Sequence, residues 1–334
     1  MSFEIWNRRY TGSKYKLADW IFDIIDKHCE GDSFCDIFAG TGIIAHHALS
    51  RMKSVAVNDF LFSNEIIYKA FFLQVEYDVN KINTYKELFQ SYNDIKIKQN
   101  YVSKNFGNKF FSMKDALLIG EIRENIEKAK DLNEKEKAIL IASLLYSADK
   151  VANTVGHYDA YIKGHKIPDQ FRFELIQPYK TNANVEIYRQ DANVLARDLQ
   201  CDIVYIDPPY NSRQYSRFYH VLENIATWKK PKLYGVALKP EPENMSEYCK
   251  SSALTAFSSL IKDLKCKYIV VSYNNTYASK SSSSTNKMTL DNIKKVLSEK
   301  GTLTCFEKAH QFFNAGKTEF ADHKELIFLV EVND

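Results

Sequence analysis

The sequence passes from an apolar segment into a glycine-rich turn at Phe34-Cys35-Asp36-Ile37-Phe38-Ala39-Gly40-Thr41-Gly42. The apolar part predicts a short strand, and residues 43–50 after the turn predict a helix. A second strand is predicted at 54–57, ending at Asn58-Asp59, and another helix follows over about 62–75. Strand, glycine turn, helix, strand and helix in this order are typical of a parallel α/β unit.

Further elements of the same kind surround this unit. Upstream, apolar residues at helical spacing predict a helix over 13–28. Downstream, strands are predicted at 185–188, 203–206, 268–272, 302–307 and 325–332, and helices at 214–228, 253–264 and 289–299. The last two strands are predicted to form an antiparallel pair joined by a long loop. The fold class that we expect is therefore α/β.

Residues 76–180 interrupt this alternation. They contain helical stretches at about 115–129 and 134–152, but no convincing unit of parallel strand and helix. We interpret them as an inserted, mainly helical subdomain between two parts of a sheet domain, residues 1–75 and 181–334.

One segment of the insertion, residues 95–114, has five lysines and no acidic residue. The lysines alternate with aromatic side chains, namely Lys96, Lys98, Lys104, Lys109 and Lys114 with Tyr101, Phe106, Phe110 and Phe111. This pattern predicts either a surface that contacts phosphates or an ordinary solvated face.

Composition limits the class of protein. The chain has 334 residues, which at about 100–200 residues per domain suggests two structural units or one domain with a large insertion. Hydrophobic residues make up 45% and charged residues 26%, ordinary values that exclude a disordered chain, a collagen or a small disulfide scaffold. The formal net charge of +3 is too small to indicate nucleic acid by itself, so any basic surface must come from local clustering.

Cysteine spacing and targeting patterns predict the compartment. None of the six cysteines forms a C-x-x-C pair, which disfavours a zinc site, and we expect no metal. Most lie in apolar runs, as buried reduced thiols of an intracellular protein do. The N-terminus has no signal-peptide pattern, and no apolar run approaches the roughly 20 residues of a membrane span. We expect a soluble, cytoplasmic protein.

The tetrapeptide Asp207-Pro208-Pro209-Tyr210 is the strongest chemical signal. It follows the predicted strand 203–206, and two successive prolines force the chain out of the sheet there. The tetrapeptide is thus held at the carboxyl edge, where open α/β folds bind ligands. A carboxylate and a rigid carbonyl can accept two hydrogen bonds from one amino group, while the tyrosine ring stacks on the base that carries it. The alternative is a Pro-Pro turn with a buried tyrosine.

The glycine turn is a weaker signal for a bound nucleoside. Gly40 and Gly42 let the backbone approach a ligand beside a helix N-terminus. Asp59, at the end of the second strand, is placed to accept both ribose hydroxyls. A plain tight turn also explains the two glycines, and a turn-forming role also explains Asp59.

Together, the glycine turn Phe38 to Gly42 and the tetrapeptide resemble the amino-group DNA methyltransferases that use S-adenosylmethionine. The order of Tyr10-Thr11-Gly12-Ser13-Lys14, glycine loop, long insertion and tetrapeptide resembles the alpha group of adenine-specific methyltransferases, relatives of the bacterial GATC-methylating enzymes. The segments 211–215 and 219–223 resemble a restriction-modification branch of that group. The resemblance implies a Rossmann-like methyltransferase sheet in which the insertion 76–180 is a DNA target-recognition subdomain.

The resemblance also implies roles for individual residues. Tyr10 and Lys14 match the motif at the methionine end of the cofactor, where a cation pairs with the carboxylate; the GATC relatives have tryptophan in place of Tyr10. The remaining cofactor residues are the loop residues Phe38, Gly40 and Gly42, the ribose acid Asp59, and Asp191 near the adenine ring. Catalysis is assigned to Asp207, Pro208, Pro209 and Tyr210, and Asp207 also touches the cofactor. Lys14 also fits a solvated surface lysine, and Asp191 also fits a cap.

The implied function is sequence-specific transfer of a methyl group from S-adenosylmethionine to the 6-amino group of adenine in double-stranded DNA. The implied partners are double-stranded DNA and a cognate restriction endonuclease. Because the target nitrogen is unreachable inside a duplex, the base must be flipped out. Two alternatives stay open: a methyltransferase on another amine, such as RNA adenine or protein glutamine, and a catalytically silent DNA-binding module. Relatives that act on other amines more often have asparagine in place of Asp207.

Overall fold

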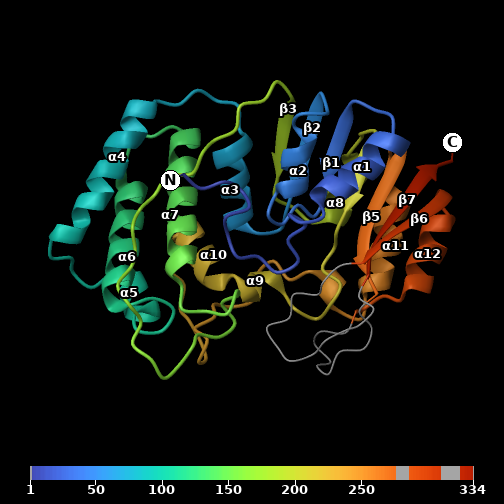
Figure 1. Ribbon diagram of the computed structural model, residues 1–334. Helices are drawn as coiled ribbons and strands as arrows, with labels where there is room; N and C mark the ends of the chain where they lie inside the picture. The colour runs from blue at the N-terminus through green and yellow to red at the C-terminus, as the bar shows by residue number, and fades with distance from the viewer. Residues whose placement is uncertain (1, 276–285, 310–323, 334) are drawn as a thin grey trace. The chain divides into compact units, whose positions relative to one another are not determined.

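The computed structural model describes residues 2–275, 286–309 and 324–333 (Figure 1). The chain forms two compact units that each combine distant segments. The first, here called the helical unit, comprises Met1–Ser13, Leu61–Thr181 and Tyr215–Glu243. The second, the sheet unit, comprises Lys14–Phe60, Asn182–Gln214 and Asn244–Asp334.

The sheet unit is built on a seven-stranded sheet in the order β3-β2-β1-β4-β5-β7-β6. Its strands are β1 Ser33–Asp36, β2 Ser54–Asn58, β3 Asn184–Tyr188, β4 Ile203–Ile206, β5 Tyr268–Asn274, β6 Gly301–Ala309 and β7 Lys324–Val332. The first five pair in parallel, whereas β7 runs antiparallel to both of its neighbours, β5 and β6. The predicted α/β class and the predicted antiparallel pair at the end of the chain are confirmed.

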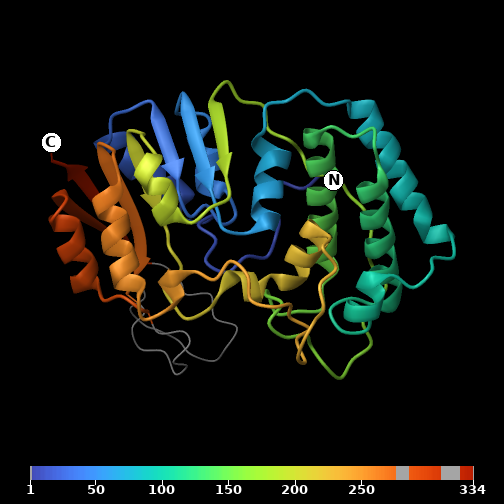
Figure 2. The same ribbon diagram turned by 180° about the vertical axis from the view of Figure 1, so that it is seen from behind.

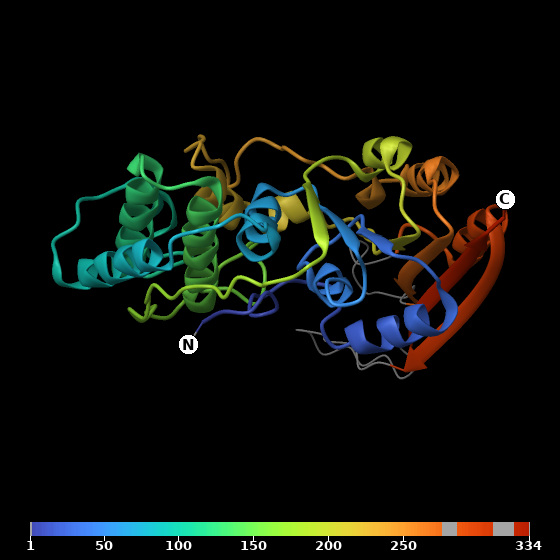
Figure 3. The ribbon, with the colours of Figure 1, turned by 90° about the horizontal axis from the view of Figure 1, so that it is seen from above.

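Helices cover both faces of this sheet (Figure 3). The helices of the sheet unit are α1 Ala18–His28, α2 Ile43–Ala48, α8 Ala192–Asp198, α11 Ala253–Asp263 and α12 Leu290–Ser298. On one face, Val204 and Val271 belong to a core that includes Leu195 of α8 and Phe257 of α11. On the other face, Phe34 of β1 contacts Phe22 of α1. β4 is buried throughout, as expected of a central parallel strand with both faces covered.

The helical unit is organised around its longest helix, α7 (Figure 2). Its helices are α3 Phe62–Phe72, α4 Val79–Ser91, α5 Tyr101–Phe106, α6 Met113–Lys128, α7 Glu134–Val151, α9 Tyr215–Phe218 and α10 His220–Thr227. α3, α6 and α10 all pack on α7, which is buried continuously over residues 138–149. The unit therefore takes in residues on both sides of the interval 76–180. Within the described part of the chain, no helix combines the length and the apolar character that crossing a membrane requires.

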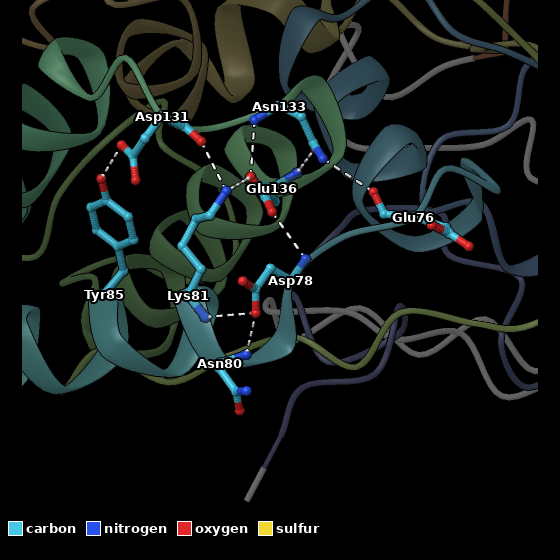
Figure 4. A network of polar contacts seen from close by, with 8 residues as sticks. All are labelled: Glu76, Asp78, Asn80, Lys81, Tyr85, Asp131, Asn133 and Glu136. Carbon is cyan, nitrogen blue, oxygen red and sulfur yellow. Dashed lines mark hydrogen bonds and ion pairs between the residues drawn. The ribbon is translucent and has the colours of Figure 1, made fainter.

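A polar network fastens the start of α4 to the loop between α6 and α7 (Figure 4). Its centre is Glu136, which is 1% exposed. The carboxylate of Glu136 accepts hydrogen bonds from the N–H groups of Asp78 and Asn133 and from Nζ of Lys81, each at 2.9 Å. Asp78 and Lys81 lie at the start of α4, whereas Asn133 and Glu136 lie at the start of α7. The network therefore joins the first turns of these two helices.

The lysine-rich segment 95–114 divides by residue type. Phe106, Phe110 and Phe111 are fully buried, and the hydroxyl of Tyr101 donates to the carbonyl of Pro231. Four of the lysines are exposed, at positions 96, 98, 104 and 114, while Lys109 is half-buried. The phenylalanines are thus part of the core of the unit, and the exposed lysines place positive charge on the surface of this segment.

Candidate active site

The tetrapeptide 207–210 leaves the sheet at the end of its central strand. β4 pairs in parallel with β1 on one side and with β5 on the other. Pro208 is buried, whereas Asp207, Pro209 and Tyr210 are half-buried. The carbonyl of Tyr210 accepts a hydrogen bond of 2.7 Å from the N–H of Lys287. The tetrapeptide is therefore anchored at the carboxyl edge of the sheet.

Lys14 contacts Asp207 from the turn that precedes α1. Its Nζ lies 2.8 Å from Oδ2 of Asp207, and the two side chains are 6% and 16% exposed. The other oxygen, Oδ1 of Asp207, is buried and has no hydrogen-bond partner among the described residues. Burial raises the pKa of Asp207, and the ammonium of Lys14 opposes that rise. Within the described structure, the ion pair thus leaves one carboxylate oxygen buried and without a hydrogen bond.

The ring of Tyr210 is held from several directions. It packs edge-on against the ring of Tyr273 at 5.4 Å between centroids and 69° between planes. Nζ of Lys14 lies 6.0 Å from its centroid. Burial raises the pKa of Tyr210 to about 12, and the nearby side chain of Asn274 acts in the opposite direction. The hydroxyl therefore stays protonated at neutral pH and the direction of the ring is defined.

The glycine turn after β1 adopts a backbone conformation that favours glycine. Gly40 and Gly42 have φ values of 54° and 80°, in the left-handed region. The N–H of Gly42 donates to the carbonyl of Ala39 at 2.7 Å, which closes the turn. The N–H of Gly40 donates to Oδ2 of Asp59 at 3.0 Å. The predicted ribose acid is thus joined directly to the predicted loop.

Asn58, at the end of β2, connects the carboxyl ends of neighbouring strands. Its Nδ2 donates to the carbonyls of Ile37 and Gln190 at 3.0 and 3.1 Å. Its Oδ1 accepts from the N–H of Gln190 at 3.1 Å. These bonds hold the segments that follow β1 and β3 beside the end of β2. The segment after β1 leads into the glycine turn, so Asn58 also helps to position that turn. Asn58 was not among the predicted site residues, because an asparagine at a strand end equally predicts a turn.

Two other predicted cofactor residues have identifiable partners. Phe38 packs edge-on against Tyr248 at 5.0 Å between centroids and 78° between planes. Asp191 is the N-cap of α8, and its Oδ1 accepts from the N–H of Asn193 at 2.8 Å. The structure therefore shows Asp191 in the capping role that was considered as the alternative.

Tyr10 belongs to the helical unit, whereas the other predicted site residues belong to the sheet unit. Its ring stacks on Tyr219 at 4.8 Å with 6° between planes, and it contacts Tyr215 at 5.2 Å. Within the sheet unit, the described contacts join Lys14 to Asp207 and to the ring of Tyr210. They also join Gly40 to Asp59.

Two carboxylates near the tetrapeptide were not among the predicted site residues. Asp36, the last residue of β1, is 1% exposed, and its Oδ1 has no hydrogen-bond partner in the described ranges. Burial raises its pKa well above the ordinary value, and the charge of Asp207 adds to the rise. Glu325 of β7, 8% exposed, acts electrostatically on both Lys14 and Asp207. The sequence signal that could have identified Asp36 is an acidic residue within an apolar strand. Glu325 could not be identified in this way, because its position depends on how β7 pairs with β5.

The titratable sulfur and metal-binding groups do not form a separate centre in the described part of the chain. The six cysteines are free thiols, and burial raises the pKa of Cys35 well above the ordinary value. No three His, Cys, Asp or Glu side chains of the described residues lie where they could hold a metal ion.

Comparison with known proteins gives the family. The family model of the D12 class N6 adenine-specific DNA methyltransferases matches residues 10–290. The type II methyltransferase M.NlaIII of Neisseria lactamica is 30% identical, over 94% of this chain and 95% of that protein. The type II methyltransferase M.CviAII of Paramecium bursaria Chlorella virus 1 is 31% identical, over 97% and 98%. The modification methylase StsI of Streptococcus sanguinis is 32% identical, over 80% of this chain and 44% of that protein.

These matches confirm the predicted resemblance to adenine-specific DNA methyltransferases. The family match runs from the N-terminal motif through the glycine turn, the insertion and the tetrapeptide. Two of the relatives are similar over almost their whole length as well as over almost the whole of this chain. The chain belongs to the D12 class of N6 adenine-specific DNA methyltransferases, which act on DNA with a methyl donor of the S-adenosylmethionine type.

Proposed function

We propose that the protein transfers the methyl group of S-adenosylmethionine to the 6-amino group of adenine at a specific sequence in double-stranded DNA. We further propose that it serves as the modification enzyme of a type II restriction-modification system with a cognate endonuclease as its partner in the cell. The names of the most similar relatives support this role, since they are type II methyltransferases and modification methylases. The family match supports DNA adenine over RNA adenine or protein glutamine as the substrate.

The observation that carries the proposal is Oδ1 of Asp207, which has no hydrogen-bond partner among the described residues. A buried carboxylate oxygen without a partner among the described residues is costly unless a ligand donates to it. The amino group of adenine has two N–H donors, and Oδ1 of Asp207 accepts one of them. We propose that the carbonyl of Pro208 accepts the other, because the two successive prolines restrict the backbone on both sides of that carbonyl.

These two acceptors would do chemical work on the amine. The lone pair of the 6-amino group is delocalised into the ring, so the nitrogen is a poor nucleophile. Hydrogen bonds to Asp207 and Pro208 hold it in its more nucleophilic geometry and in line for attack, and positioning of this kind supplies much of the rate. Positive charge develops on the nitrogen during attack, and the carboxylate stabilises it.

The residues that would hold the cofactor fit its chemistry. Bound S-adenosylmethionine supplies an electrophilic methyl group on a sulfonium. Its ammonium group needs an acceptor, and Oδ1 of Asp36 is a buried acceptor with no partner in the described ranges. Asp59 accepts from Gly40 and is a carboxylate, a group that can accept several hydrogen bonds, as the two ribose hydroxyls require. Tyr10 is proposed at the methionine end, Phe38, Gly40 and Gly42 beneath the cofactor, and Asp191 near its adenine ring.

DNA binding is proposed for the insertion 76–180 as the target-recognition subdomain. Exposed lysines of the segment 95–114 are the proposed phosphate contacts, since their side chains face solvent. The target base must leave the duplex, and Tyr210 is the proposed stacking platform for it. The edge-on contact of Tyr210 with Tyr273 supports this role, because it defines the direction of the ring.

The test is a comparison of methyl acceptors. The protein is incubated with S-adenosylmethionine labelled in its methyl group and with duplex DNA, structured RNA or a protein extract, and the product is identified by mass spectrometry. We expect N6-methyladenine in DNA. Asp207→Ala should abolish transfer while unfolding stays cooperative, whereas the exposed Asp198→Ala should retain it. Label in RNA or protein, or wild-type turnover by Asp207→Ala, would refute the proposal.

A further inference from the structure

We infer that Lys14 is a positioning residue for methyl transfer, because its ammonium binds Oδ2 of Asp207 and thereby leaves Oδ1 to accept the substrate amine. This inference rests on the proposed function of Asp207. It gives Lys14 a role through a protein side chain, in contrast to the cofactor carboxylate that the family resemblance implies as its partner.

The geometry of the pair is well defined. The distance of 2.8 Å between Nζ and Oδ2 is that of a charge-assisted hydrogen bond, and both side chains are largely withdrawn from solvent. The backbone of Lys14 is held as well, since its carbonyl accepts from the N–H of Leu17 at 2.9 Å. Leu17 is the N-cap of α1, and its side chain is 3% exposed. The lysine therefore extends from a fixed base, and a buried pair of this kind has little freedom to exchange partners.

The charges around Asp207 make a cation necessary. Glu325 acts on Asp207 and on Lys14, and Asp36 is coupled to Asp207, to Lys14 and to Asp59. Tyr210 and Tyr205 also act electrostatically on Lys14 and raise its pKa. Burial works to lower the pKa of Lys14, but the carboxylate of Asp207 outweighs it together with these groups, so the pKa lies well above its ordinary value. Lys14 is thus charged throughout the working pH range.

The consequence for catalysis concerns the protonation of Asp207. Burial raises the pKa of Asp207, Glu325 adds to the rise, and Lys14 opposes both. If Lys14 loses its charge, Asp207 takes up a proton at a higher pH than before. A neutral carboxylic acid stabilises the developing positive charge on the amine poorly. The rate should then fall on the acidic side of the pH profile, and raising the pH should restore it.

The two roles of Lys14 therefore predict different measurements. A lysine that binds the cofactor carboxylate changes the cofactor dissociation constant and leaves the pH dependence of the methyl-transfer step unchanged. A lysine that acts through Asp207 moves the acid limb of that step and leaves cofactor affinity within about twofold.

The experiment measures single-turnover methyl transfer against pH, with saturating labelled S-adenosylmethionine and duplex DNA. The variants are Lys14→Gln and Lys14→Met, which remove the charge, Lys14→Arg, which keeps it, and the exposed Lys16→Gln as a matched control. We expect the first two to lose at least about tenfold at neutral pH and to recover as the pH rises. Lys14→Arg and Lys16→Gln should keep the wild-type acid limb. Thermal unfolding of each variant shows that it is folded.

An unchanged acid limb in both neutral variants would overturn the inference, whether or not cofactor affinity falls. Should one neutral variant fail to fold, the other still gives the result. Failure of the proposed function is a separate outcome, because it appears as wild-type turnover by Asp207→Ala and not in the Lys14 variants.

Discussion

Tyr210 should act mainly through its ring, and a pair of substitutions separates the ring from the hydroxyl. Tyr210→Ala removes both, whereas Tyr210→Phe removes only the hydroxyl, on which the side chain of Asn274 acts. Stacking of a base on an aromatic side chain is worth about 1–3 kcal/mol by alanine substitution. A neutral hydrogen bond contributes about 0.5–1.5 kcal/mol.

These magnitudes predict the order of the two variants. Since about 1.4 kcal/mol corresponds to a factor of ten, Tyr210→Ala should lose one to two orders of magnitude in rate. Tyr210→Phe should keep most of the activity and lose at most about tenfold, because the edge-on contact with Tyr273 still directs the ring.

The assay is single-turnover methyl transfer to a duplex with one target site, together with 2-aminopurine fluorescence at the target position. Tyr210→Ala should also stabilise the extruded base less, which the fluorescence reports. The matched control is Tyr268, the first residue of β5, at the opposite end of that strand from Asn274. Its Phe and Ala variants should leave the transfer rate unchanged. If Tyr210→Phe is as damaged as Tyr210→Ala, the hydroxyl and Asn274 carry the effect and the stacking argument is refuted.

Two further predictions concern DNA binding and acid stability. Neutralising four lysines together should reduce the slope of log affinity against log salt by roughly 0.9 for each phosphate that the protein no longer binds. These are the four exposed lysines of the segment, Lys96, Lys98, Lys104 and Lys114, and an unchanged slope would mean that DNA binds elsewhere on the protein. Asp202 accepts from two N–H groups and one hydroxyl near the start of β1, and its ion pair with Lys267 lowers its pKa. Its stabilising contribution is therefore complete above the unfolded carboxyl pKa of about 4 and is lost as the pH falls below it. Asp202→Ala should lower stability by about 1.5–3 kcal/mol at neutral pH, and a gap in melting temperature that does not narrow in acid would contradict this.

The order of strands and helices along the chain could be predicted from the sequence because the central strands of the sheet are buried on both faces. Apolar runs such as 203–206 are continuous there, and the structure contains β4 over the same residues. Three helices, α4, α5 and α8, were missed, and one predicted helix is divided in two. α4 buries only Ile82 and Phe89, while its other apolar residues Val79 and Leu88 are exposed, so the sequence shows no clear apolar face there. The helix predicted over 214–228 is instead the two helices α9 and α10, with Tyr219 between them at φ −113° and ψ 21°.

The site was predictable where one short motif contains the chemistry. The tetrapeptide 207–210 and the glycine turn are each a single continuous stretch of sequence. Their prolines and glycines indicate the backbone conformation directly. The ion pair between Lys14 and Asp207 joins residues that are far apart in the chain, so its geometry follows only from the fold. Glu325 and Asn274 lie opposite each other because β7 pairs with β5, and the sequence does not specify that pairing.

The central claim is that this chain methylates adenine N6 at one sequence in duplex DNA. The most direct test incubates unmethylated duplex DNA of varied sequence with the protein and S-adenosylmethionine and then locates the modified bases by single-molecule sequencing. We predict N6-methyladenine at every copy of one short sequence and at no other adenines. Methyl groups on cytosine, methyl groups scattered without regard to sequence, or unmodified DNA after exhaustive incubation would contradict this claim.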